Sequence, residues 1–171
     1  APAGMDRTKV SLSSGGLTLA VGATNGAMRS LARTLSYGEF TGGDLGTMGF
    51  DTAIGGLADG NAPGNVYLSY AMGDLVVGLG SDIAGNEQDI AVRYTVNSFT
   101  IAAGANTNDG WMVRGALDLG NVSAAIGYNS NETALLTVGY DISDATALNF
   151  AVQNATAGTS YALHVSQDLG G

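Results

Sequence analysis

Residues 89–169 read DIAVRYTVNSFTIAAGANTNDGWMVRGALDLGNVSAAIGYNSNETALLTVGYDISDATALNFAVQNATAGTSYALHVSQDL. Tight turns are predicted at Gly73-Asp74, Asn97-Ser98, Gly120-Asn121, Asp144-Ala145 and Gly170-Gly171. Looser polar stretches separate them, at 81–88, 107–110, 129–133 and 154–160. This alternation predicts an antiparallel meander with short turns at one end and longer loops at the other.

Each predicted strand has a bulky apolar face and a smaller or more polar face. In the first of them, Ile90, Val92 and Tyr94 share one face, whereas Ala91 and Arg93 share the other. Seven successive segments repeat this pattern. A period of two residues predicts strands and excludes helices over this stretch.

The composition indicates what the bulky face meets. Charged residues make up 12% of the chain, below the roughly 25% usual in soluble domains, and there is a single lysine. The smaller faces consist mostly of Ala, Gly, Ser and Thr, which suits an interior wall. We therefore predict an all-β fold, a transmembrane antiparallel up-and-down β-barrel whose bulky face meets lipid. Residues 1–171 are expected to form a single barrel domain.

Aromatic residues on the bulky face gather toward the two strand ends. Those near the tight turns are Tyr70, Tyr94, Phe99 and Tyr140, and those near the longer loops are Trp111, Tyr128 and Tyr161. Amphipathic rings favour headgroup depth, so the two groups are expected to form aromatic belts at the two membrane interfaces. Ordinary core aromatics at strand ends are the simpler alternative.

Charge and cysteine usage exclude several classes of partner. The chain has no cysteine, so it has neither disulfides nor thiolate metal sites. Six basic against 15 acidic residues give a net charge of −9, which argues against nucleic acid as a partner. No apolar run approaches the roughly 18 residues of a membrane-spanning helix.

The first part of the chain is less regular. Strands are predicted at 7–13 and 17–23, and two poorer ones at 28–34 and 35–40. Residues 41–64 then show no alternation, and loops this long inside a compact domain are usually functional or disordered. This loop and its approach carry Glu39, Asp44, Asp51 and Asp59. The meander resumes at Asn65, which gives about 13 strands in all.

At this point the chain resembles the general diffusion porins of alphaproteobacteria. The segments GNAPGNVYLSYAMGDLVVGLGSD (60–82) and SYALHVSQDLGG (160–171) are similar to porin strands. The acidic segment 41–64 stands where that family's third loop folds inward and narrows the pore. The resemblance implies a 16-stranded barrel, of which this chain would supply the second to fourteenth strands, in a homotrimer in the bacterial outer membrane. An opening strand and the terminal strands are missing from this pattern, so either the sequence is partial or the strand count is wrong.

The resemblance also gives the charges a role. The basic residues expected on the pore wall are Arg7, Lys9, Arg29, Arg33, Arg93 and Arg114. An acidic constriction loop opposite them would produce a transverse field that discriminates among small hydrophilic solutes. No cofactor is expected, although carboxylates on acidic loops could hold Ca²⁺.

Three other functions remain open. They are a non-conducting structural or adhesive outer-membrane barrel, a soluble acidic β-sandwich or surface-layer domain, and an outer-membrane hydrolase built on His164 and Ser166. The hydrolase is the weakest, because alternate residues of one strand lie about 7 Å apart, beyond hydrogen-bond reach.

Overall fold

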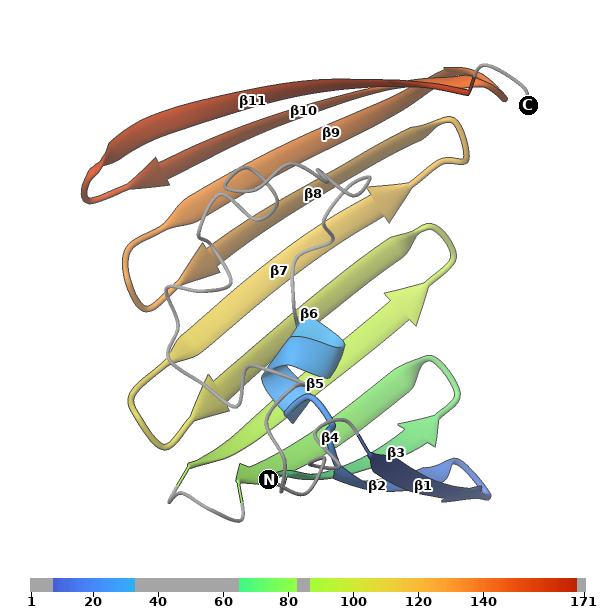
Figure 1. The fold of residues 1–171 in the computed structure, drawn as a ribbon, viewed down its shortest axis with the longest axis vertical. Coiled ribbons are helices and arrows are strands. Elements are labelled where there is room, and N and C mark those ends of the chain that lie inside the picture. The colour runs from blue at the N-terminus through green and yellow to red at the C-terminus, as the bar shows by residue number, and fades with distance from the viewer. Residues whose placement is uncertain (1–7, 33–64, 83–86, 169–171) are drawn as a thin grey trace, which may run out of the picture.

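The computed structural model describes residues 8–32, 65–82 and 87–168. Within them, one antiparallel sheet holds eleven strands in chain order (Figure 1). The strands are β1 (Lys9–Ser14), β2 (Leu17–Gly22), β3 (Asn65–Met72), β4 (Leu75–Asp82), β5 (Gln88–Val96), β6 (Phe99–Asn106), β7 (Trp111–Asp118), β8 (Val122–Asn129), β9 (Ala134–Ser143), β10 (Thr146–Ala155) and β11 (Gly158–Gln167). β1 and β11 are its two edges.

The tight turns predicted at Gly73-Asp74, Asn97-Ser98, Gly120-Asn121 and Asp144-Ala145 join consecutive strands, whereas Gly170-Gly171 lies outside the described residues. Gly15 and Gly16, between β1 and β2, have φ angles of 56° and 86°. Positive φ at both central residues gives a turn whose twist matches that of the flanking strands, which is why two glycines occur here. Asn97, at the β5–β6 turn, has φ 50°, a conformation that asparagine tolerates better than most residues.

Two of the longer loops are stabilised in the same way, by hydrogen bonds from backbone N–H groups to an asparagine side-chain oxygen. The Asn106 Oδ1 atom accepts hydrogen bonds from the backbone N–H groups of Asn108 and Gly110, at 3.0 and 2.8 Å. In the next loop at that end, Asn129 Oδ1 accepts from the N–H groups of Asn131 and Thr133, at 3.0 and 3.2 Å. Side-chain oxygens thus satisfy donors that the ladder no longer pairs.

The structure corrects three details of the sequence prediction. The segment 28–34, predicted as a strand, begins instead with a short π-helical turn, η1 (Met28–Ala32). Met28 and Leu31 are three positions apart, so one helical turn buries both, whereas strand alternation would separate them. The stretch 154–160 is not a longer loop, because β10 and β11 extend to Ala155 and Gly158 and leave a two-residue turn.

The strand count also changes, because the segment 28–34 begins with η1 and not with a strand. The described residues contain eleven of the about 13 predicted strands, and the strand predicted at 35–40 lies outside them and stays a prediction. No helix of the described part is long and apolar enough to cross a membrane.

Candidate pore wall

The two faces of the sheet differ in accessibility in the way the alternation predicts. On the bulky face, Ile101 is 48% and Ile126 60% exposed. On the small-residue face, Ala91 is 2% and Ala102 6% exposed. Large apolar side chains therefore point away from the molecule, the reverse of a soluble sandwich. We call these the outer face and the inner face.

Helix η1 lies on the inner face. It packs against β4, β5, β6 and β7, and Figure 1 shows it as the blue coil in front of these strands. The buried apolar cluster at this contact comprises Ala27, Met28, Leu31, Ala32, Ala91, Ala102 and Met112, with Tyr67 and Val76 partly buried beside it. The segment that follows β2 therefore begins by packing against the inner face of the sheet.

Two polar side chains of the wall hold the backbone of this segment. The Asp89 carboxylate is 5% exposed, and its Oδ1 and Oδ2 atoms accept hydrogen bonds from the N–H groups of Ala27 (3.0 Å) and Met28 (2.8 Å). The Asn65 Nδ2 atom donates to the Thr24 carbonyl oxygen at 2.8 Å. A carboxylate at the first N–H groups of a helical turn satisfies donors that have no partner within the helix.

Glycines on the inner face make room for this contact. A Cβ built on Gly78 would lie 2.8 Å from Leu31 Cδ1, and one on Gly104 would lie 2.7 Å from Met28 Cγ. A Cβ on Gly80 would overlap the Asp89 carboxylate. Glycine within a strand provides no side chain to pack, and it often marks a place where another backbone segment approaches closely. Here that segment is η1.

The predicted basic wall residues are partly brought together. Backbone register places Arg93 opposite Ala102 and Ala102 opposite Arg114, so the two arginines flank one alanine across three strands. Their Cα atoms are about 10 Å apart, two strand spacings. Both lie on the inner face and are partly buried.

The other basic residues are scattered. Lys9 is exposed on edge strand β1, and Arg29 is partly buried on η1. Arg7 and Arg33 lie outside the described residues.

The predicted acidic constriction lies outside the described residues altogether. This applies to Glu39, Asp44, Asp51 and Asp59, to the loop 41–64 and to the Ca²⁺ binding considered for it. Within the described residues, no group of three or more His, Asp or Glu side chains could hold a metal ion. His164 and Ser166 share the inner face of β11, where Asn149 pairs with His164.

A polar hollow lies on the inner face at the tight-turn end of β6–β11. Its volume is about 470 Å³. The charged and hydroxyl-bearing residues that line it are Ser98, Thr100, Arg114, Asp118, Ser123, Asp141 and Ser166. The wall beyond η1 therefore carries both signs of charge around this hollow.

The predicted belt aromatics are all exposed on the outer face. At the longer-loop end, the rings of Trp111 and Tyr128 lie side by side on β7 and β8, with centroids 5.8 Å apart and planes tilted by 55°. At the tight-turn end, Tyr94 pairs with Leu75 and Tyr140 with Val122. Tyr70, Phe99 and Tyr161 are likewise exposed. Whether they lie at headgroup depth stays a prediction.

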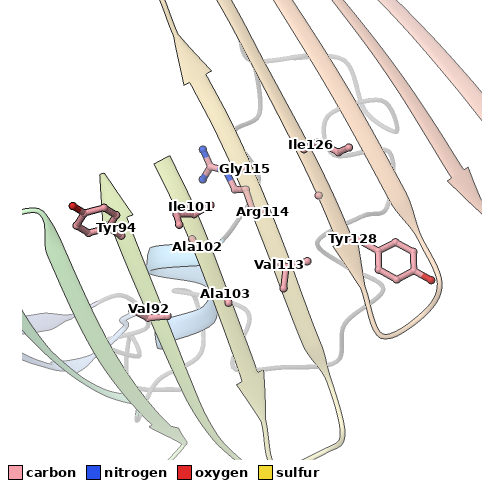
Figure 2. Close-up of a pocket in the computed structure, with 11 residues that line it drawn as sticks. Val92, Tyr94, Ile101, Ala102, Ala103, Val113, Arg114, Gly115, Ile126 and Tyr128 are labelled. Carbon is pink, nitrogen blue, oxygen red and sulfur yellow. The ribbon is translucent and has the colours of Figure 1, made fainter. Parts of the chain in front are cut away.

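The outer face is interrupted at Gly115. A mainly apolar hollow of about 620 Å³ lies around it. The residues that line it include Val92, Tyr94, Ile101, Val113, Ile126 and Tyr128, drawn as sticks in Figure 2. A Cβ on Gly115 would meet only Ile126 Cγ2, at 3.7 Å. Unlike the inner-face glycines, Gly115 accommodates no neighbouring segment among the described residues.

Sequence reasoning missed the residues that hold η1. Asp89 and Asn65 were not singled out, although Asp89 shares the small-residue face of its strand with Ala91 and Arg93. A lone carboxylate on such a face, beside strand glycines at 78, 80 and 104, was the available signal.

Comparisons with known proteins agree with this architecture. The family model described as Gram-negative porin matches residues 1–171. An engineered mutant of Rhodopseudomonas blastica porin is similar in structure, with a TM-score of 0.77 and 18% identity over 95% of this chain and 67% of that one. The outer-membrane expressed OmpT of Vibrio cholerae gives a TM-score of 0.74 and 13% identity over 96% of this chain and 66% of that one. No curated protein matches the sequence.

Proposed function

Because the chain belongs to the Gram-negative porin family, whose members are non-enzymatic outer-membrane proteins, we propose that it forms a water-filled diffusion channel. Small hydrophilic solutes and ions would cross it passively. Membership also sets aside the hydrolase and the soluble sandwich as functions for this chain.

The observation that carries the proposal is the opposite orientation of the two faces. Bulky apolar residues such as Ile101 on β6 and Ile126 on β8 point outward, while Arg93 and Arg114 point inward on the neighbouring strands β5 and β7. In a membrane, ionised side chains are stable only where they border water or a partner. Two arginines on one wall therefore favour a hydrated interior.

The charges give the channel a means of discrimination. The Arg93–Ala102–Arg114 row is proposed as the basic side of a constriction, and Glu39, Asp44, Asp51 and Asp59 as its acidic side. Opposed charges across a narrow hydrated passage orient water and select solutes by charge and dipole.

The assembly is proposed to be a homotrimer embedded in outer-membrane lipid. Porins are commonly trimeric, and the exposed apolar outer face supplies surface for contact with both lipid and neighbouring subunits.

A barrel that does not conduct is the second candidate, and one observation favours it. Helix η1 fills part of the inner face with apolar side chains over β4–β7, as a plugged interior would require. The polar hollow beside it favours the open channel.

Reconstitution distinguishes the two candidates. The purified protein in planar bilayers should give discrete ohmic conductance steps, and liposomes containing it should swell in arabinose faster than in raffinose. Replacing Asp44, Asp51 and Asp59 by Asn should shift ion selectivity toward anions. Protein that inserts but neither conducts nor admits sugar would establish the non-conducting barrel.

A further inference from the structure

Asp89 is a buried carboxylate that binds the backbone of a distant part of the chain. Both of its oxygens accept hydrogen bonds from backbone N–H groups of a segment about 60 residues earlier in the chain, at Ala27 and Met28. It is buried, and neither bond belongs to the sheet ladder. We propose that Asp89 is a positioning residue that fixes η1 on the channel wall and thereby sets the open cross-section of the channel.

The surroundings of Asp89 are shaped for this role. Gly80 pairs with Asp89 across β4 and β5, and a Cβ at Gly80 would overlap its carboxylate and lie 2.9 Å from the Ala27 nitrogen. A substitution as small as Gly80→Ala would therefore push the carboxylate or η1 off the wall. This position combines a strand glycine, a buried carboxylate and the start of a helical turn.

The observed contact uses both oxygens of the carboxylate. The N–H groups of Ala27 and Met28 are bonded to different oxygen atoms of Asp89, and an amide would replace one of these oxygens with an NH₂ donor. Hydrogen bonds to an ionised acceptor are also about twice as strong as neutral ones. Asparagine at position 89 would keep the side-chain volume but would replace one acceptor oxygen with an NH₂ group. That NH₂ donor would then face a backbone N–H donor of Ala27 or Met28.

The functional consequence follows from where η1 lies. Its apolar residues cover Ala91, Ala102 and Met112 on β5–β7, which would otherwise face the lumen. Release of η1 would expose this part of the wall to water and widen the passage on the side of Arg93 and Arg114. This inference rests on the proposed channel function, whereas the attachment of η1 by Asp89 can be tested separately.

The first experiment measures conductance. Asp89→Asn should raise single-channel conductance by about one half or more, or split one level into several, because local opening becomes populated when a charged hydrogen bond is lost. Asp109→Asn is the matched control, since Asp109 is an exposed carboxylate in the β6–β7 loop. Gly80→Ala should reproduce the Asp89→Asn result through a different residue.

The second experiment reads the position of η1 without conductance. The chain has no cysteine, so Ala102→Cys places a single thiol beneath η1. A water-soluble methanethiosulfonate should label it about tenfold faster when Asp89→Asn is added, since labelling follows the opened population. Equal labelling and equal conductance in both backgrounds would overturn the proposal.

The third experiment restores the contact. A Cβ built on Gly78 lies 3.2 Å from the Ala27 Cβ, close enough for a disulfide after a small adjustment. Oxidised Ala27→Cys/Gly78→Cys should return the Asp89→Asn channel to its original conductance, and reduction should reverse this. A cross-linked Asp89→Asn channel that keeps the altered conductance would also overturn the proposal. If the native protein never conducts, the channel function is contradicted. The labelling experiment would then still test whether Asp89 attaches η1 to the wall.

Discussion

Two glycines on neighbouring strands, Gly104 on β6 and Gly115 on β7, occupy opposite faces of the sheet. A Cβ on Gly104 would lie 2.7 Å from Met28 Cγ, whereas one on Gly115 would have only Ile126 Cγ2 near it, at 3.7 Å. The inner glycine makes room for another segment of the chain, and the outer one leaves a hollow (Figure 2). The same residue therefore has a packing role on one face and no protein neighbour to accommodate on the other.

The largest expected effect comes from filling these two positions. Gly104→Val should lower the free energy of unfolding by about 3 kcal/mol, because the added atoms meet Met28 and the Ile90 carbonyl oxygen. Gly115→Val should change it by less than about 0.5 kcal/mol. Urea unfolding in lipid vesicles measures both, and equal destabilisation would contradict the contrast.

Removing side chains from the two faces should give a smaller difference. Met112→Ala should destabilise the protein by about 2 kcal/mol, because it leaves a cavity under η1 that protein alone can fill. Ile126→Ala on the outer face should cost less than about 1 kcal/mol, because lipid chains occupy the vacated space. The same unfolding assay applies, with Ile126→Val as the conservative control.

Charge removal tests the inner face alone. Arg93→Gln with Arg114→Gln should shift the permeability ratio of the channel toward cations about threefold to fivefold at low salt. The shift should shrink at 1 M salt, where the Debye length falls to about 3 Å. Reversal potentials under a KCl gradient measure it, and Lys9→Gln at the sheet edge is the comparison. An unchanged reversal potential would contradict a role of Arg93 and Arg114 in ion selectivity.

The smallest effect is expected at the longer-loop end of the outer face. Trp111→Leu or Tyr128→Leu should each destabilise the protein by about 0.5–1 kcal/mol through loss of their ring contact and interfacial position. The part of the loss that comes from the interfacial position should disappear in detergent micelles, which have no planar headgroup layer. Persistence of the full loss in micelles would assign these rings to protein packing alone.

The strands and their facing could be predicted from the sequence because alternation repeats over many residues. The bulky face was expected to point outward, and Ile101 and Ile126, which belong to it, are exposed. Helix η1 could not be predicted, because five residues give too short a sample to separate a helical period from a strand period. The role of Asp89 was missed because its partners are about 60 positions away in the chain.

The charged residues of the pore wall were only partly predictable. The alternation within each strand placed Arg93 and Arg114 on the same face of the sheet. Their alignment across β5, β6 and β7 depends on strand register, which the pattern of a single strand does not reveal. The turn at 156–157 was missed because polar residues such as Asn154 and Thr159 continue the ladder there, with their side chains hydrogen bonded at 3.1 Å.

The pairing of Gly22 with Asn65 has a consequence for how such proteins diversify. These two residues are direct cross-strand partners, so residues 23–64 leave and re-enter the sheet at a single rung. The segment between these two residues can be lengthened, shortened or exchanged without changing the register of the strands, provided that the replacement packs against the same inner-face glycines. In the proposed channel, variation of this segment would change the constriction while the strands that carry Arg93 and Arg114 keep their register.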